Sequence, residues 1–209
     1  MNTDNWLDTC WSFQEGFALV TIGSKYNYID KEGKFLSPIW FEWADDFIEG
    51  FAVVRVDEKY NYIGKDGKLV SDKYFDWCGE FFGGLSRVRI DSKWNFIKAD
   101  GSFLFDKWAD YCEFFQNGFS RVKRASKWNI INHDGDFISD EWFDWCGSAF
   151  RGFIRVCQKD KWNFMDVDGS LLLSNGVDYL SDFNGELADA IVNGNVVYID
   201  TKGGLHEHK

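Results

Sequence analysis

The clearest pattern along the chain is an alternation of side chains that begins after a glycine and returns every 34 residues. In residues 51–56, Ala52 and Val54 fall on one side of an extended chain, and Val53 and Arg55 fall on the other. A period of two predicts a β-strand, and the small residue followed by Val indicates a packed face. The preceding glycines are Gly16, Gly50, Gly84, Gly118 and Gly152.

A second segment with the same period follows a tight turn and consists of Lys, an aromatic residue and Asn. It occurs at 25–27, 59–61, 93–95, 127–129 and 161–163. This segment predicts a second strand, and a turn with Gly in its last position predicts a hairpin after it. A short third strand is expected at 34–36, 68–70 and 136–138, and an aromatic segment connects to the next unit.

The fixed period predicts a repeat protein. The repeats span 5–38, 39–72, 73–106, 107–140, 141–174 and 175–208 of a single domain, 1–209. The fold class is all-β: six antiparallel β-meanders stacked as an open, β-solenoid-like superhelix. The last repeat is degenerate, with Gly176 in place of Trp142 and Val196 in place of Trp162, which favours the open stack. A six-bladed β-propeller is the alternative.

The order of these residues resembles the WG-repeat (KWG) family of bacterial proteins. The resemblance is best in Gly16-Phe17-Ala18-Leu19-Val20 and in residues 25–34, and it covers nearly the whole chain. The chain departs from the family at the Gly of the WG pair, which is Asn27 and its counterparts here. The resemblance implies a β-repeat module and supplies no catalytic residue.

Composition narrows the functional classes. Aromatic residues make up 19% of the chain, which is incompatible with a disordered acidic protein. The net charge of −11 disfavours nucleic acid and anionic membranes as partners. No apolar run is long enough for a membrane helix, and no secretory signal is visible, so we expect a cytoplasmic protein. Five cysteines without a CxxC pair indicate neither a disulfide framework nor a zinc site.

Two columns of basic residues are the first candidate binding site. Arg87, Arg121 and Arg155 share one position of the first strand. Arg55, Arg89 and Lys123 share the position two residues further. Stacking would join them into a positive stripe for a carboxylate-rich or phosphorylated partner. The alternative is that they pair with an acidic column or face water. That column comprises Glu42, Asp76, Asp110 and Asp144.

The aromatic column of the second strand contains Tyr60, Trp94, Trp128 and Trp162. These rings could be core residues that pack one repeat on the next, or stacking platforms for sugars. We favour the core, and we expect the neighbouring Asn column to satisfy backbone groups. The Cys column, with Ala44 in the same position, indicates a small buried residue. His206-Glu207-His208 could bind a metal only weakly.

Symmetry argues against an enzyme, because catalysis needs different groups in different roles, whereas nearly every polar candidate recurs in several repeats. The sequence predicts no cofactor and no metal. The favoured function is a non-catalytic protein-interaction or scaffold module that presents a repeated β surface to another protein. A multivalent carbohydrate-binding protein and an acidic immunity or inhibitor protein for a basic partner are the alternatives.

Overall fold

The computed structural model describes residues 7–207, so residues 5–6 and 208, at the ends of the predicted repeats, lie outside it. The described residues form β-strands and turns and contain no helix. All strand pairs are antiparallel, and the strands form six separate sheets of three or four strands in sequential order. The repeated all-β fold that the sequence predicts is confirmed.

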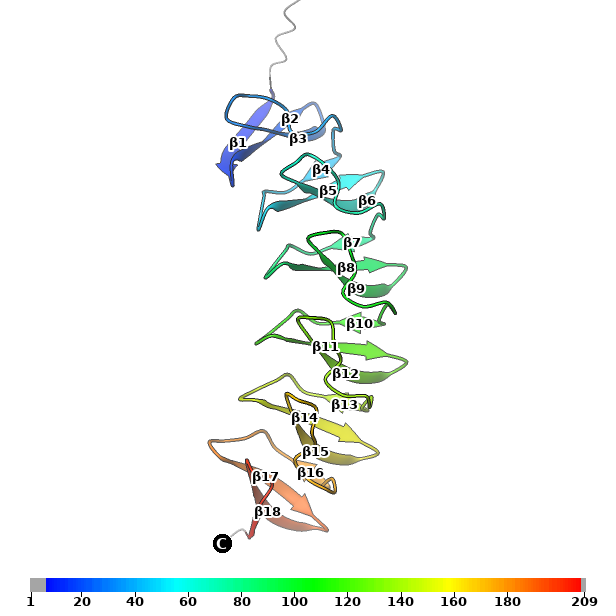
Figure 1. Cartoon of the computed structure of the whole chain (residues 1–209), viewed down its shortest axis with the longest axis vertical. Coiled ribbons are helices and arrows are strands. Elements are labelled where there is room, and N and C mark those ends of the chain that lie inside the picture. The colour runs from blue at the N-terminus through cyan, green and yellow to red at the C-terminus, as the bar shows by residue number, and fades with distance from the viewer. Residues whose placement is uncertain (1–6, 208–209) are drawn as a thin grey trace, which may run out of the picture. The chain divides into compact units, whose positions relative to one another are not determined.

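The chain divides into two compact units, Met1–Trp108 and Ala109–Lys209, and the boundary falls at the start of the fourth predicted repeat. In each unit three sheets follow one another (Figure 1). The first unit contains β1 (Thr9–Gln14), β2 (Phe17–Ile22), β3 (Lys25–Ile29), β4 (Trp43–Ala44), β5 (Phe51–Val56), β6 (Lys59–Gly64), β7 (Trp77–Cys78), β8 (Leu85–Ile90) and β9 (Lys93–Lys98). The second contains β10 (Tyr111–Cys112), β11 (Phe119–Arg124), β12 (Lys127–Asn132), β13 (Trp145–Cys146), β14 (Phe153–Gln158), β15 (Lys161–Asp166), β16 (Tyr179–Leu180), β17 (Leu187–Val192), β18 (Asn195–Asp200) and β19 (Leu205–Glu207).

Two-residue turns set the register of each sheet. Glu49 and Gly50 before β5 have φ of 50° and 87°, and Asp57 and Glu58 after it have φ of 48° and 63°. Two successive positive φ angles define the type of turn whose twist matches that of antiparallel strands. The predicted tight turns are therefore confirmed, and Gly67 in the following hairpin has the expected positive φ of 78°.

The expected third strand is wrong in the first five repeats. Residues 68–70 make only one bridge, Ile63↔Leu69, and the third strand of that sheet is β4, which lies in the aromatic connecting segment. The reason is that the chain leaves the sheet at Ser71, whose carbonyl is held by the side chain of Asn61. In the last repeat the expected strand does form, because β19 pairs with β18 over three residues.

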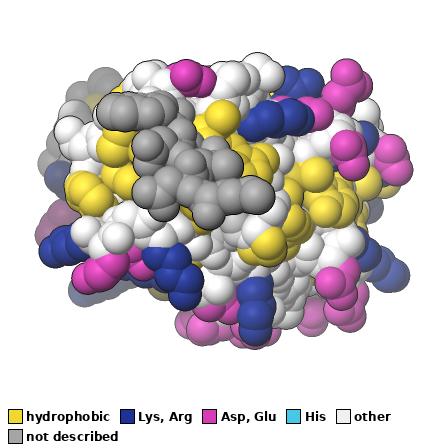
Figure 2. Space-filling view, turned by 90° about the horizontal axis from the view of Figure 1, so that it is seen from above, with side chains coloured by type: hydrophobic (Ala, Val, Ile, Leu, Met, Phe, Trp, Pro, Cys, Tyr) yellow, Lys and Arg dark blue, Asp and Glu magenta, His cyan; other side chains and the backbone are white. Residues whose placement is uncertain are grey.

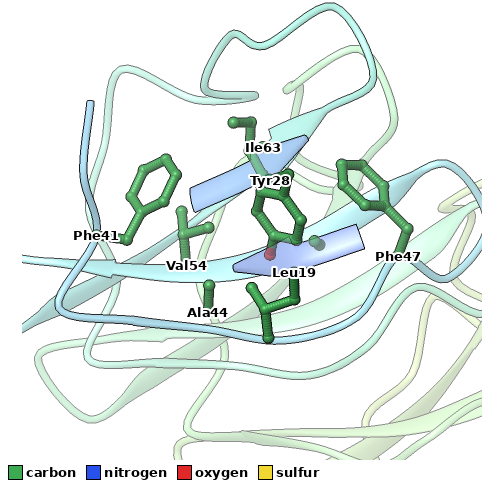
Figure 3. Close-up of a cluster of buried hydrophobic side chains, with 8 residues drawn as sticks. Leu19, Tyr28, Phe41, Ala44, Phe47, Val54 and Ile63 are labelled. Carbon is green, nitrogen blue, oxygen red and sulfur yellow. The ribbon is translucent and has the colours of Figure 1, made fainter. Parts of the chain in front are cut away.

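The core lies between successive sheets. Figure 3 shows Leu19 and Tyr28 of the first repeat packed against Phe41, Phe47 and other residues of the second. Equivalent clusters join the second repeat to the third, the fourth to the fifth and the fifth to the sixth. Removing a Leu-sized or Phe-sized side chain from water stabilises by about 1.5–3 kcal/mol. The prediction that each repeat is stabilised by its neighbours agrees with this arrangement.

The Asn column has the predicted role of satisfying backbone groups. Asn129 is fully buried, and its Nδ2 donates to the carbonyls of Ser139 and Glu141 at 2.7 and 3.1 Å. Its Oδ1 accepts from the backbone N–H of Ile130 at 2.7 Å. A buried peptide carbonyl without a partner is costly. This need explains why Asn, and not the Gly of the WG pair, follows the aromatic residue.

The hairpin glycines are required by a close approach of two backbones as well as by their φ. A Cβ on Gly169, where φ is 94°, would lie 2.1 Å from the carbonyl oxygen of Ile138 in the preceding repeat. Gly67 and Gly101 lie equally close to the preceding repeat, with corresponding distances of 2.2 Å. The second, third and fifth repeats therefore contact their predecessors at a point where a side chain does not fit.

Replacing Asn129 by Ala should lower the free energy of unfolding by about 1–3 kcal/mol, because buried carbonyls lose their donor. Urea unfolding followed by tryptophan fluorescence measures the change. Asn195→Ala is the matched control, since Asn195 is exposed and its side chain forms no hydrogen bond within residues 7–207. Equal effects of the two substitutions would contradict the assigned role.

Gly169→Ala and Gly152→Ala separate backbone strain from steric clash. Gly152 has a φ of 85° with no atom within 4 Å of a Cβ, so its substitution should cost only about 1–2 kcal/mol of conformational strain. Gly169→Ala adds the clash with Ile138 and should lower the unfolding free energy clearly further. Thermal unfolding of the two variants measures this difference. A smaller loss of unfolding free energy for Gly169→Ala than for Gly152→Ala would refute the contact.

Candidate functional site

An aromatic–cation row crosses the sheet in three repeats. In the second repeat, Trp43 of β4 pairs with Arg55 of β5, which pairs with Tyr60 of β6. We call the equivalent sets the aromatic–cation rows. They are Trp43–Arg55–Tyr60 and Trp77–Arg89–Trp94 in the first unit and Tyr111–Lys123–Trp128 in the second. In the fifth repeat the central position is Cys157, between Trp145 and Trp162.

The row of the third repeat shows the geometry most fully. The rings of Trp77 and Trp94 have centroids 5.4 Å apart at an interplanar angle of 58°. Arg87 places its guanidinium carbon 5.2 Å from the Trp77 ring and 4.5 Å from the Trp94 ring. Arg89 lies 5.4 Å from Trp94. A cation within about 6 Å of an indole face is attracted by the ring, so both arginines are fixed against these tryptophans.

Two of the predicted binding arginines also hold adjacent repeats together. Arg121 and Arg155 donate through Nη1 to the carbonyls of Cys146 and Leu180 in the following repeats, at 2.8 and 2.9 Å. Each also lies over an aromatic ring of its own repeat: Arg121 is 5.3 Å from the Trp128 ring, and Arg155 is 5.2 Å from the Trp145 ring. The sequence indicated a continuous stripe but gave no reason to expect these contacts between repeats.

The predicted pairing with the acidic column is right at one position and wrong at two. Arg55 lies 3.9 Å from Glu42, as that alternative requires. Arg121 instead forms a two-pronged ion pair with Glu113, which raises the pKa of the guanidinium. Arg155 lies 3.5 Å from Asp182. Glu113 belongs to the same repeat as Arg121, and Asp182 belongs to the repeat after Arg155, whereas acidic-column residues such as Asp144 bind the backbone of a hairpin turn.

The acidic column joins a turn to the preceding repeat. Asp144 accepts a hydrogen bond from the backbone N–H of Lys159 at 2.8 Å and forms an ion pair with Lys127. The Lys127 ammonium holds the pKa of Asp144 below its usual value. Asp76 and Asp178 have the same arrangement, with Lys59 and Lys161 as their cations. Lys59, Lys127 and Lys161 of the Lys–aromatic–Asn segments therefore link each repeat to the next.

The rings of the rows are only partly covered. Trp94 and Trp128 are half-buried, as is Trp162 at the equivalent position of the fifth repeat, and each lies beside an aromatic residue of a short strand. The short-strand residues are more open: Trp43 is 38% exposed and Tyr111 39% exposed. The tightly packed aromatic positions are instead Phe41, Phe75 and Phe143, which are almost completely buried. The rows thus offer ring edges and cations at a solvent-facing surface.

The remaining candidates give no reactive centre. Cys112 and Cys146 are buried, and burial raises the pKa of the Cys78 and Cys146 thiols to about 12. His206 hydrogen-bonds to Asp200 at 2.7 Å, and His208 lies outside the described residues.

Within residues 7–207, no three His, Cys, Asp or Glu side chains gather as metal ligands. This part of the chain also contains no helix that is long and apolar enough to cross a membrane.

Comparison with known families identifies the repeat. The model of the WG containing repeat matches residues 7–26, 28–60 and 62–94. The fold is that of a repeat β protein, and residues 7–94 are tandem WG repeats, which confirms the predicted family. No curated protein matches the chain.

Three solved structures have remote similarity to the chain. Apo AztD from Citrobacter koseri is 11% identical, with 95% of this chain and 71% of that chain covered and a TM-score of 0.39. Kluyveromyces lactis Hsv2p is 8% identical, with 92% and 75% covered and a TM-score of 0.37. A protein of unknown function from Bacteroides caccae is 14% identical, with 82% and 81% covered and a TM-score of 0.26. Scores this low carry no argument about this chain.

The Asp144 ion pair predicts a pH-dependent contribution to stability. A carboxyl group whose folded-state pKa is depressed stabilises the fold above its unfolded pKa, and this contribution is lost as the pH falls through the folded pKa. Asp144→Asn should therefore lower the melting temperature at about pH 7, and the difference from the wild type should vanish near pH 2.

Melting temperatures across this pH range measure the effect. Asp140→Asn is the control, because Asp140 is exposed and forms no ion pair within residues 7–207. A difference between wild type and Asp144→Asn that persists at the lowest pH would contradict the ion-pair explanation.

Proposed function

We propose that the protein is a non-catalytic interaction module that binds another polypeptide across its aromatic–cation rows. The observation that carries this proposal is the recurrence of a half-exposed ring–cation–ring row at one position of the sheet in the second, third and fourth repeats. Aromatic residues and arginine are the side chains that contribute most to binding energy at protein interfaces. Repetition would give a partner several equivalent contacts.

The chemistry of the rows favours a polypeptide segment that carries carboxylate or phosphate groups beside apolar side chains. Arg89 offers a guanidinium next to the ring of Trp94, so an acidic group and an apolar group can be met side by side. The net charge of −11 opposes acidic partners at long range, but screening limits that repulsion to about 8–10 Å. Local contacts then decide specificity.

Binding of carbohydrate is the second candidate. Exposed rings are the observation that favours it, since Trp43 and Tyr179 are 38% and 48% exposed and recur at one position of the short strands. Aromatic faces stack on apolar faces of sugars, and several equivalent rings would allow multivalent binding. Under this alternative, the aromatic residues contribute to the affinity for the sugar and the cations do not.

Selection of peptides from a random display library on the purified protein tests the first proposal. We expect selected peptides to combine acidic and apolar residues. Arg89→Gln should weaken their binding about 10–100-fold, the value of a hydrogen bond to a charged group. Lys68→Gln is the control, because the Lys68 side chain is 83% exposed on a hairpin. Isothermal titration calorimetry measures the affinity of both variants for the selected peptides.

Three outcomes distinguish the candidates. Loss of peptide binding in Arg89→Gln alone supports the polypeptide partner. An absence of selected peptides, or an equal loss in both variants, refutes it. Binding to a glycan array that is retained by Arg89→Gln and lost in Trp43→Ala would instead establish the carbohydrate alternative.

A further inference from the structure

Two turns in the first unit bind a carboxylate from the preceding repeat. In the second repeat, the central turn residues Glu49 and Gly50 have φ of 50° and 87°, and the N–H of Gly50 donates to Glu15 at 2.9 Å. In the third repeat, the N–H groups of Gly83 and Gly84 donate to the two carboxylate oxygens of Glu49 at 2.9 and 3.0 Å. Neighbouring backbone N–H groups in such turns form a concave anion site.

The turn in the second repeat binds the ionised form of the carboxyl group. The ammonium of Lys65, 3.0 Å from Glu15, and the backbone N–H groups of the turn lower the pKa of Glu15. A donor that bonds to the charged form of an acid stabilises that form. The contact therefore selects a charged carboxylate, and a neighbouring cation strengthens it.

The equivalent turn of the fifth repeat has the same backbone geometry. Arg151 and Gly152 have φ of 51° and 85°. Phe150 and Phe153, on either side, exchange backbone hydrogen bonds of 2.8 and 3.0 Å, as their counterparts do in the second repeat. Within residues 7–207, the backbone N–H groups of Arg151 and Gly152 form no hydrogen bond. Both residues are exposed, so both donors are open to a ligand.

The preceding repeat supplies no carboxylate to this turn. Asn117 occupies the position of Glu15 and Glu49. Its Nδ2 donates to the carbonyl of Ala149 at 3.5 Å, so the side chain contributes a donor and no charge. The fifth repeat thus keeps two N–H donors that the third repeat uses to bind a carboxylate.

The surroundings of the turn combine a cation with apolar surface. The guanidinium carbon of Arg151 lies 5.3 Å from the ring of Phe150, which is 54% exposed. The position of Lys65, the cation beside Glu15, is occupied by Val167, which is 39% exposed. A ligand that bonds to the turn through an anionic group can therefore place an apolar group beside it.

The acidic character of the chain does not prevent a local anion site. The net charge of −11 acts at long range and is screened beyond about 8–10 Å at physiological ionic strength. The face in Figure 2 exposes basic side chains as well as acidic ones. Binding at the turn then depends on its own N–H groups and on Arg151.

We propose that the turn at Arg151 and Gly152 binds the carboxylate of a Glu or Asp side chain in a partner polypeptide. The two N–H groups would donate to the two carboxylate oxygens, as Gly83 and Gly84 do to Glu49. An apolar side chain of the same segment would lie against Phe150. A carboxylate is the occupant because equivalent turns hold one in two other repeats. This site contains no residue of the aromatic–cation rows and is independent of them.

Titration of the ¹⁵N-labelled protein with three probes tests the proposal. The acidic probe is N-acetyl-Phe-Glu-amide, its neutral match is N-acetyl-Phe-Gln-amide, and inorganic phosphate is the third. The acidic probe should move the amide proton resonances of Arg151 and Gly152 downfield, because these groups gain a hydrogen-bond acceptor. The neutral probe should bind about tenfold more weakly, since a hydrogen bond to a charged group is stronger than one to a neutral group.

A substitution in the preceding repeat should close the site from within. Asn117→Glu places a carboxylate where Glu15 and Glu49 have theirs, and Asn117 already has a φ of 52°, close to the 50° of both glutamates. This variant should bind the acidic probe about tenfold more weakly than the wild type. Asn117→Gln is the matched control, because it has the same length without the charge, and it should keep the wild-type affinity. Far-ultraviolet circular dichroism establishes that both variants are folded.

The outcomes decide the proposal. An acidic probe that binds no tighter than the neutral probe, or that binds Asn117→Glu as tightly as Asn117→Gln, overturns it. Phosphate that shifts the two resonances at lower concentration than the acidic probe also overturns it, because the site would then select a different anion. Arg89→Gln, which tests the rows, should leave these two shifts unchanged, so failure of either proposal is recognised separately.

Discussion

The structure depends on the burial of apolar side chains between successive sheets. A three-stranded sheet of this size cannot cover its own faces, so each repeat is stable only when a neighbour lies on it. Tyr28 shows the principle, because it belongs to the first repeat but is buried among side chains of the second. The fixed positions of Asn, Gly and the acidic residues follow from the need to repeat this apolar packing every 34 residues.

Constant spacing creates a second requirement, which is the satisfaction of polar groups at each junction. A buried Asn binds the connecting segment, an acidic residue joins a turn to a lysine of the preceding repeat, and a glycine allows two backbones to meet. These groups are spaced by the same 34 residues as the core, so an insertion would displace all of them together. The strict period is therefore a consequence of packing and hydrogen bonding acting at once.

The same regularity shapes what the protein can bind. Rows such as Trp77–Arg89–Trp94 are rigid, because strands fix the backbone and the cation is held against the rings. Such a surface suits a partner with several similar contacts.

The sequence by itself determined the period, the two main strands, the tight turns, the buried Ala–Val face and the family, because these depend on local alternation and turn chemistry. It also suggested that Asn satisfies backbone groups. Only the tertiary structure decided that β4, and not residues 68–70, completes the sheet, and that Arg121 pairs with Glu113. Only the structure shows that Arg89 lies against the ring of Trp94 and that Gly176 lines a hollow. These features depend on which side chains meet across strands and between repeats, and a linear pattern does not contain those distances.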